Sequence, residues 1–416
     1  MKNKRLYQLA WEATSAELGA EPNTELPRSR AFGGSRRDGR LTLSNRPAIL
    51  AFVHETHPSH ALPARFGKYT LLSKIAEGGM AEIFLAVEDT PHTGRRFVII
   101  KRIHPTRADD PDYQDFFLSE GRISIRCAHP NIPQVYELDR IGGIYYLAME
   151  VIRGHTLLEF VRCCHIREEP ATVSSLVCVG LGVAAALEHA HSLTDVDGCP
   201  LGVIHRDVSP QNILIDDSGT VKLIDFGVAR SSVQEHRTRT GVVKGKFSYL
   251  APELLEAKRP PDARVDVFAT GVVLYEALTG KPLFRGSSDK KTLANIRFAP
   301  IRDLRSLRED VPRGVARVIH TALERDPERR HASASELLQA LDDAAADAGL
   351  RASRLALRDE VRAVCGDHTP PEAYLAQHGH IPEPIPGLSP ALAARDPQLA
   401  YFLRQAGAHG EPQSAP

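Results

Sequence analysis

The sequence predicts an α+β protein with two lobes, a small β-rich lobe followed by a larger, mainly helical one. Two observations predict this fold class. Between Tyr69 and residue 152, runs of β-branched and apolar residues alternate with glycine turns around one helical stretch. After Gly154 the pattern becomes helical and includes two long apolar segments, 176–187 and 265–278. Ligand sites favour crevices between such lobes, so we expect the functional residues there.

The small lobe is predicted to start with a hairpin. Residues 69–89 form two apolar-rich runs around a Gly-Gly turn, which is a hairpin signature. The segment "RFVIIKRI" (96–103) is a third strand, and residues 144–152 are a further one. Between these two strands we expect a helix, because Asp110 is a favourable N-cap and Pro111 suits the first helical position.

The large lobe is predicted to be built around segments 176–187 and 265–278, which are apolar enough to be buried helices. Gly280 follows the second segment where a C-terminal cap belongs. Ser333 and Glu336 have the spacing of a capping box and open a late helix. Both apolar segments are shorter than the ~18 to 20 residues that cross a bilayer, so no membrane span is expected.

Two extensions flank the folded part. Residues 1–66 mix arginine, glycine, proline and serine and are expected to be poorly ordered. Residues 346–416 continue a helical pattern and then become proline-rich. The 52 basic and 52 acidic residues cancel, which gives no reason to expect a nucleic-acid partner. Six cysteines without a CxxC pair favour reduced thiols and a cytoplasmic protein.

Five polar residues stand where an apolar fold has no reason to put them. They are Lys101 in an apolar strand, Glu120 on the next helix, Asp207 and Asn212 on either side of a turn, and Asp225 after a strand. A lysine in such a strand is costly unless it is paired, and Glu120 is the expected partner. Two acids and an amide suit a hard divalent cation such as Mg²⁺. Taken singly, each signal also has a structural reading, since a buried Lys–Glu pair often only holds a fold together.

The order of these residues along the chain resembles that of Hanks-type (eukaryotic-like) bacterial serine/threonine protein kinases. The resemblance covers residues 67–345 and rests on "IAEGGMAEIFLA", "VIIK", "FLSEGR", "HRDVSPQN", "DFG" and "APE". It implies the bilobal protein-kinase fold, with a small lobe at about 67–150 and a large lobe at about 154–345. It also implies phosphoryl transfer from ATP–Mg²⁺ to Ser or Thr hydroxyls of a protein substrate.

Residue roles follow from this resemblance position by position. Lys101 would hold the α- and β-phosphates of ATP, and Glu120 would fix its orientation. Asp207 would accept the proton of the substrate hydroxyl or orient that hydroxyl. Asn212 and Asp225 would hold Mg²⁺, with Mn²⁺ as a possible substitute. The remaining ATP contacts would come from the glycine-rich loop and the hinge, at Ala76, Glu77, Gly78, Gly79, Met80, Ala81, Ile83, Met149, Glu150 and Val151.

The resemblance also implies supporting residues. Glu253 and Arg330 resemble a buried ion pair that anchors the end of the activation segment. Asp266 resembles an acid that braces the catalytic loop from a buried helix, and Arg206 resembles an arginine that binds a phosphorylated activation segment.

We expect autophosphorylation at Thr238 or Thr240, because a phosphate there could pair with Arg206. The alternative is a mobile loop in which the threonines are exposed to solvent and are not phosphorylated.

The sequence departs from the family pattern at several positions. Ala76 and Ala81 replace the first and third glycines of the loop, which stiffens the turn by roughly 0.5–1 kcal/mol. The link before the catalytic loop is lengthened by "DVDGCPLG" (195–202), which we interpret as a surface turn. Ser209 stands where the family has a lysine, and Lys246 stands where it has a threonine. We hypothesise that Lys246 supplies the missing charge; the alternative is a solvated lysine.

Three functions stay open at this point. They are an active Ser/Thr protein kinase, a catalytically weak pseudokinase that serves as an ATP-binding scaffold, and a small-molecule phosphotransferase of related fold. The five polar residues above are all present, which argues against the pseudokinase. A long activation segment presents protein substrates, which argues against the third function. The sequence names no substrate protein or activating signal, and homodimerisation stays possible.

Overall fold

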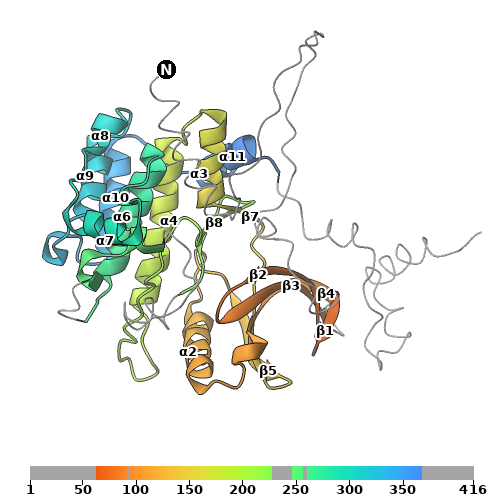
Figure 1. Ribbon diagram of the computed structural model, residues 1–416. Helices are drawn as coiled ribbons and strands as arrows, with labels where there is room; N and C mark the ends of the chain where they lie inside the picture. Colours follow the sequence, from red (N-terminus) through yellow and green to blue (C-terminus); the bar gives the residue numbers. More distant parts are fainter. Residues whose placement is uncertain (1–61, 91–93, 227–245, 256–259, 368–416) are drawn as a thin grey trace, which may run out of the picture.

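The computed structural model describes residues 62–90, 94–226, 246–255 and 260–367. Figure 1 shows two lobes, one formed by a curved sheet with helix α2 beside it and the other formed by the remaining helices. The chain passes from one lobe to the other between residues 149 and 154, after the last strand of the large sheet. The predicted α+β arrangement with a small sheet lobe and a large helical lobe is therefore confirmed.

The sheet of the small lobe has six antiparallel strands in the order β1-β2-β3-β4-β6-β5. The predicted hairpin is β2–β3, and the strand that carries Lys101 is β4. The predicted strand 144–152 ends at Met149, because the chain leaves the sheet there to reach the other lobe. The strands are β1 (Ala64–Phe66), β2 (Tyr69–Glu77), β3 (Ala81–Thr90), β4 (Gly94–Ile103), β5 (Val135–Ile141) and β6 (Ile144–Met149).

Helix α2 (Pro111–Arg126) begins where the sequence predicts. Asp110 is its N-cap, and the side chain accepts a hydrogen bond from the backbone N–H of Asp112 at 3.2 Å. Its buried face packs on β5 and β6. Gly121 lets the helix come close, since a Cβ there would lie 3.0 Å from the side chains of Leu138 and Leu147. This close packing brings the neighbouring Glu120 toward the sheet.

The large lobe contains eight of the helices that the structure describes, a small three-stranded sheet in the order β7-β8-β9, and several short 3-10 turns. The helices are α3 (Leu157–Arg167), α4 (Val173–His191), α6 (Arg264–Thr279), α7 (Asp289–Phe298), α8 (Leu304–Leu307), α9 (Arg313–Ala322), α10 (Ala334–Asp347) and α11 (Arg354–Cys365). The strands are β7 (Gly154–Thr156), β8 (Ile213–Asp216) and β9 (Val221–Leu223), and the turns used below are η3 (Lys246–Tyr249), η4 (Pro252–Leu255) and η5 (Pro327–Arg329).

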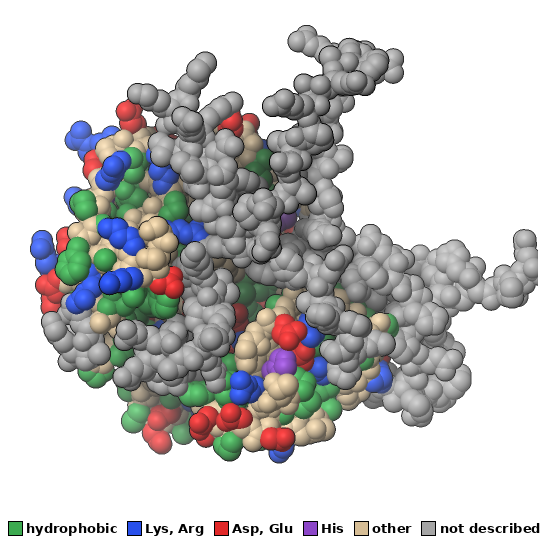
Figure 2. Space-filling model, viewed as in Figure 1, with side chains coloured by type: hydrophobic (Ala, Val, Ile, Leu, Met, Phe, Trp, Pro, Cys, Tyr) green, Lys and Arg blue, Asp and Glu red, His purple; other side chains and the backbone are tan. Residues whose placement is uncertain are grey.

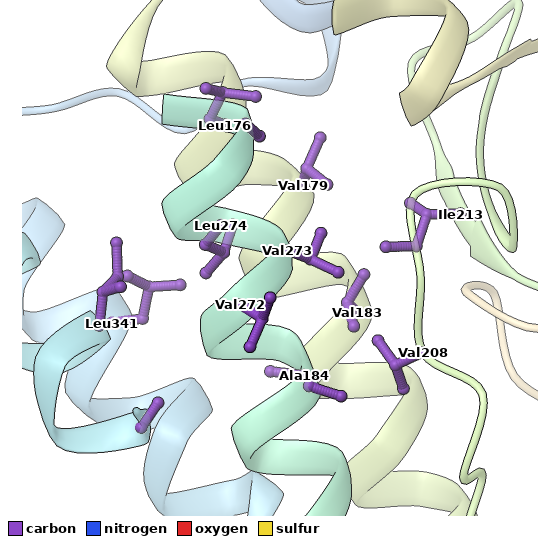
Figure 3. Close-up of a cluster of buried hydrophobic side chains, with 14 of the residues drawn as sticks. Leu176, Val179, Val183, Ala184, Val208, Ile213, Val272, Val273, Leu274 and Leu341 are labelled. Carbon is purple, nitrogen blue, oxygen red and sulfur yellow. The ribbon is translucent and has the colours of Figure 1, made fainter. Parts of the chain in front are cut away.

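The two apolar segments form α4 and α6, which pack together in the core of the large lobe. Gly180 permits the close approach, because a Cβ there would lie 2.8 Å from Leu341 and 3.0 Å from Leu274. The same core includes Val208 of the loop 205–212. Figure 3 shows the side chains that meet here: Leu176, Val179, Val183 and Ala184 of α4, Val272, Val273 and Leu274 of α6, Leu341 of α10, Val208 of the loop and Ile213 of β8.

Helix α4 is longer than the apolar segment that predicted it, because it continues from Val173 to His191. By length and composition it is the one helix among the described residues that could cross a membrane. However, 67% of its most apolar window is buried inside the protein, as in the core helix of a globular domain.

The predicted helix caps are present, with one difference in detail. Gly280 ends α6 in the left-handed conformation (φ 64°). Ser333 caps α10 by accepting the backbone N–H of Glu336 at 3.1 Å. The Glu336 carboxylate reaches back to the N–H of Ala332 at 2.6 Å, one residue before the N-cap that a capping box would use. Residues 195–202 form the predicted surface turn, in which the Asp195 side chain accepts from the N–H groups of Asp197 and Cys199.

The surface carries both signs of charge side by side. Figure 2 shows Lys and Arg side chains interspersed with Asp and Glu over the visible parts of both lobes. In the small lobe several of them are paired, for example Lys68 with Glu88 at 3.0 Å and Arg102 with Glu82 at 2.9 Å. This distribution agrees with the balanced composition.

Candidate active site

A cavity of about 300 Å³ lies between the two lobes. Strands β2, β3, β4 and β6 contribute its walls on the small-lobe side, together with α2. Strand β8 and the residues after β9 contribute the opposite walls. Of the predicted site residues, the lining includes Ala76, Ile83, Lys101, Glu120, Met149, Glu150, Asn212 and Asp225. The inter-lobe crevice that the sequence suggests therefore exists and holds most of the predicted polar groups.

Lys101 is held between two carboxylates. Its Nζ lies 2.6 Å from Glu120 of α2 and 3.0 Å from Asp225, and its side chain is only 13% exposed. Burial disfavours the charged ammonium, but the attraction of Asp225 and Glu120 outweighs that penalty and raises the pKa of Lys101. The lysine therefore stays cationic inside the cavity.

The sheet register explains why Lys101 faces the cavity. Residue Ile83 of β3 lies opposite Lys101 of β4, and Leu147 of β6 lies opposite it on the other side. Residues paired across neighbouring strands point to the same face of a sheet. All three residues line the cavity, so one sheet face supplies both its apolar wall and its cation.

Asp266 of α6 braces the catalytic loop (205–212), as predicted. Its carboxylate is fully buried and accepts the backbone N–H groups of His205 at 2.7 Å and Arg206 at 2.8 Å. It also pairs with Nε2 of His191 at 2.8 Å. Burial alone would raise the pKa of Asp266, but the hydrogen bond from His191 and the electrostatic attraction of that ring, together with the backbone donor of Arg206, lower it. A charged carboxylate thus fixes the backbone just before Asp207.

His205 links this loop to the segment that carries Asp225. Its ring Nδ1 accepts the N–H of Asp207 at 3.2 Å, so the ring proton is assigned to Nε2, which donates to the carbonyl of Ile224 at 3.0 Å. Its ring also contacts the ring of Phe226, with centroids 4.6 Å apart. Burial is the main cause that lowers the pKa of His205, which keeps the ring neutral.

Asn212 and Asp225 meet because of the β8–β9 hairpin. Asn212 directly precedes β8, Asp225 follows β9, and the pairing of Ile213 with Leu223 brings these two ends together. The N–H of Ile224 donates to the carbonyl of Asn212 at 2.9 Å. The Asn212 amide nitrogen donates to the carbonyl of Asp207 at 2.8 Å, which leaves its amide oxygen for another partner.

The donor set at this place fits Mg²⁺. It consists of the Asn212 amide oxygen and the carboxylate of Asp225, whose side chain is 42% exposed toward the cavity side. Magnesium favours one or two protein oxygens together with phosphate oxygens and water. Asp225 adopts a left-handed backbone (φ 58°), which is uncommon for a residue other than glycine and is typical of functional sites.

The glycine-rich loop is anchored by its own turn and by two residues that the sequence analysis did not single out, Lys74 and His104. Gly78 donates to the carbonyl of Ala81 at 2.9 Å, and the backbone N–H of His104 donates to the carbonyl of Met80 at 2.9 Å. The Glu77 carboxylate binds Lys74 at 2.8 Å and Nε2 of His104 at 3.2 Å. Of the predicted loop residues, Ala76 and Ile83 line the cavity, whereas Glu77 and Ala81 end the strands on either side of the turn 78–80, outside the lining.

The side chains of the predicted hinge lie in different surroundings. Met149 and Glu150 line the cavity, but the side chain of Val151 packs against the apolar cluster of β2 and β3, and Ile152 lines the cavity instead. The Glu150 carboxylate is occupied, because it binds Lys222 of β9 at 2.7 Å and accepts the N–H of Gln134 at 3.0 Å. Glu150 therefore ties the hinge to the large lobe.

Most cavity residues that sequence reasoning missed are apolar. They are Ile75, Ile99, Ile132, Pro133, Val135, Leu147, Leu214, Ile224 and Phe226, with Ser124, Thr156 and Gln211 as polar additions. An apolar residue in a strand gives the same sequence signal whether it faces a core or a ligand. Only the register of the strands and the packing of the lobes separates the two cases.

The predicted ion pair between Glu253 and Arg330 is present and anchors η4. The two side chains form a two-pronged pair with distances of 2.6 and 2.7 Å. The other N–H groups of the guanidinium donate to the carbonyls of Glu324, Arg264 and Arg325. All five donors of this buried arginine are therefore satisfied, which is the condition for burying a charge.

The side chains of three predicted residues are outside what the structure describes. Thr238 and Thr240 belong to the segment 227–245, and of Lys246 only the backbone, which opens η3, is described. Arg206 is described and adopts a left-handed backbone (φ 63°) under the hydrogen bond to Asp266.

Comparison with known proteins adds to this geometry. Residues 69–341 match the protein kinase domain family. The chain belongs to the protein kinase family. It is of the Hanks type that the motifs predicted. Members of this family bind ATP and protein substrates, so the cavity and the polar residues around it form the candidate active site of a kinase domain.

Several relatives support this membership. The kinase is 38% identical over 277 residues to the tyrosine-protein kinase MasK of Myxococcus xanthus, which takes in 67% of this chain and 43% of MasK. It is 34% identical to a probable serine/threonine-protein kinase PknB of Corynebacterium glutamicum, over 73% of this chain and 45% of that protein. It is 30% identical to the serine/threonine-protein kinase PknH of Mycobacterium tuberculosis, over 68% of this chain and 42% of PknH. The chain thus matches less than half of the length of these relatives.

The fold has a solved counterpart. The crystal structure of the Mycobacterium tuberculosis PknI kinase domain aligns with a TM-score of 0.51 and 24% sequence identity, over 69% of this chain and 99% of that domain. This likeness supports the bilobal kinase fold. The relatives are named for both tyrosine and serine/threonine activity.

Proposed function

We propose that this chain is an active serine/threonine protein kinase that uses ATP and Mg²⁺. The observation that carries the proposal is the meeting of Lys101, Glu120 and Asp225 in one cavity, with Asn212 linking that cavity to Asp207. A pseudokinase would have lost one of these groups. Among the similar relatives, most names favour serine/threonine specificity, as for the kinases of Corynebacterium efficiens and Mycobacterium bovis. The name of MasK favours tyrosine instead.

The roles of the residues follow from charge and geometry. ATP bound with Mg²⁺ supplies the phosphoryl group, and the cation neutralises charge that develops on it. Lys101 offers a positive charge for the phosphates, while Asn212 and Asp225 offer oxygens for the metal. Asp207 orients the substrate hydroxyl and takes its proton. Such a site acts by positioning and charge compensation, which a rigid, braced loop favours.

The proposal includes a relocated charge. Ser209 replaces the usual lysine of the catalytic loop and is buried, at 9% exposure. Lys246 supplies the cation that the loop lacks. Lys246→Ala should therefore lower the turnover of ATP with a protein substrate, and Ser209→Lys in that variant should restore part of it. If Lys246→Ala keeps full activity and unchanged affinities for ATP and substrate, then Lys246 does not replace the missing lysine. The proposal that the chain is an active kinase would remain.

The decisive experiment is incubation of the wild type and Asp207→Asn with radiolabelled ATP and Mg²⁺, followed by phosphoamino-acid analysis. We expect phosphoserine or phosphothreonine in the wild type and a loss of label in the variant. Phosphotyrosine alone would change the substrate class. Absence of label in a wild type that still binds ATP would favour the scaffold.

We also propose that the kinase is cytoplasmic and phosphorylates itself at Thr238 or Thr240, with Arg206 as the partner of the phosphate. Phosphosite mass spectrometry after incubation with ATP tests this directly. Phosphate only in residues 1–66 or 346–416 would contradict it. A concentration series by light scattering tests homodimerisation.

A further inference from the structure

Helix α11 lies beyond the matched family region, yet it is docked on the large lobe. Figure 1 shows α11 beside α3, at the end of the lobe far from the sheet. The Glu360 carboxylate accepts from the N–H of Thr172 at 2.7 Å and from its hydroxyl at 2.6 Å, and it also accepts from the hydroxyl of Ser175. Thr172 is the N-cap of α4, so these bonds attach α11 to the start of the core helix.

Two free thiols, one on α11 and one on α3, lie where these helices pack together. Cys163 lies on α3, and Cys365 is the last residue of α11. Their side chains share a hydrogen bond, and both residues are partly exposed. The adjacent Cys164 differs, because it faces the core and is buried. Two interacting thiols, each partly exposed and each on a separate packed helix, meet the first requirement for a disulfide, which is proximity.

The electrostatics give the two thiols different roles. The hydrogen bond from Cys365 is the main cause that lowers the pKa of Cys163; Arg167 lowers it further, against the effects of burial and of Glu159. The pKa of Cys365 is raised by the same bond. Burial raises the pKa of the Cys127, Cys164 and Cys178 thiols. Cys163 is therefore the nucleophile of the pair, and Cys365 is the thiol that resolves its oxidised form.

We propose that Cys163 and Cys365 form a reversible intramolecular disulfide when the protein meets hydrogen peroxide. The Cys163 thiolate attacks one peroxide oxygen, the O–O bond breaks, and the leaving hydroxide takes a proton to become water. The Cys365 sulfur then attacks the sulfenic sulfur of Cys163, the S–O bond breaks, and a second water leaves with the Cys365 proton. The two thiols lose two electrons in total, and one peroxide is reduced to two waters.

The cross-link would hold the end of α11 against α3. Because the closed loop between the two cysteines is long, the disulfide should restrict the unfolded chain strongly and raise the midpoint of thermal unfolding. Disulfide formation does not require catalysis. It can therefore be tested separately from the proposed kinase activity.

The test uses the full chain, treated with hydrogen peroxide and then mapped by mass spectrometry of peptides without reduction. We expect a peptide pair joined through Cys163 and Cys365 that has lost two hydrogen atoms, and a loss of two free thiols per chain. Dithiothreitol should restore both thiols. The oxidised wild type should unfold at a higher temperature than the reduced one.

Matched variants sharpen the result. Cys163→Ser and Cys365→Ser should each abolish the linked peptide, whereas Cys199→Ser, which removes an exposed thiol elsewhere, should leave it unchanged. The rate of iodoacetamide alkylation at Cys163 near neutral pH should fall in Cys365→Ala, because alanine offers no donor to the Cys163 thiolate. A linkage that uses Cys164 in place of Cys163, or sulfinic acid at Cys163 with no linked peptide in the wild type, would overturn the proposal. The wild-type map decides even if a variant fails to fold.

Discussion

Asp266 holds the backbone of Arg206 in place. The buried carboxylate accepts the N–H of Arg206 at 2.8 Å, and Arg206 adopts a left-handed conformation (φ 63°). Such a conformation is unfavourable for arginine unless its surroundings enforce it. The chain then turns directly into Asp207, so an acidic residue on α6 sets the position of the proposed proton acceptor.

Asp266→Asn should therefore lower kcat by about 100-fold, since a small displacement of catalytic groups has an effect of that size. The amide can accept fewer of the three hydrogen bonds and leaves a buried donor unpaired, which costs about 1–3 kcal/mol of stability. Steady-state kinetics and urea unfolding check the two effects. Asp262→Asn, the same change at a side chain that is 50% exposed, serves as the control. An Asp266→Asn enzyme with the wild-type kcat would contradict the brace.

His104 is expected to position the glycine-rich loop. Its Nδ1 accepts the N–H of Thr106 at 3.3 Å, which assigns the ring proton to Nε2 and directs it to Glu77. His104→Ala should raise KM for ATP by about 5-fold, the equivalent of one hydrogen bond of about 1 kcal/mol, with kcat within about twofold of wild type.

His104→Gln retains a donor and should recover part of the affinity for ATP. His165→Ala, an exposed histidine on α3, should leave KM unchanged. A fall in kcat without a change in KM would count against a role in binding.

Glu276 makes the stability depend on pH. Its carboxylate accepts from the hydroxyl of Tyr249 in η3 at 2.8 Å and from the N–H of Leu283 at 2.7 Å, and burial raises its pKa from 4.5 to about 7. At pH values between these two pKa values, Glu276 is protonated in the folded state and ionised in the unfolded state. The free energy of unfolding should therefore fall as pH rises from about 5 to about 7, and then stay level.

The size of this effect follows from the shift. A difference of about 2.5 units between the two states corresponds to at most about 3 kcal/mol. Glu276→Gln cannot titrate, so the difference in free energy of unfolding between wild type and variant should shrink by that amount from pH 5 to pH 8. Urea unfolding at both pH values measures it. A constant difference would show that Glu276 ionises normally.

Glu360 is predicted to stabilise the large lobe from outside the matched family region. Glu360→Ala removes three hydrogen bonds at the N-terminus of α4 and should lower the free energy of unfolding by about 1–2 kcal/mol. The neighbouring Asp359→Ala, which removes only an exposed pair with Arg358, should change it by less than about 0.5 kcal/mol. Equal effects of the two variants would mean that α11 is not held by this contact.

Much of the candidate site could be predicted because its polar residues break the local apolar pattern. Lys101 in an apolar strand and Asp225 after one are visible in the sequence, and so is the cap at Asp110. The apolar lining of the cavity could not be predicted, since Ile99 or Leu214 reads as an ordinary core residue. Within the hinge, the side chain of Val151 packs on the β2–β3 cluster and Ile152 lines the cavity, a difference that the sequence does not show.

The sequence by itself determined the two-lobe order, the hairpin, the main helices and the identity of the five polar residues. Local propensity and residue spacing act over a few residues, so the elements that depend on them can be predicted from the sequence. The tertiary structure alone decided the contacts between distant residues: Lys101 with Asp225, Asp266 with the catalytic loop, Glu77 with His104, and α11 with α3 and α4. These depend on strand register and on which helix faces pack together, and both are set by burial of the whole core.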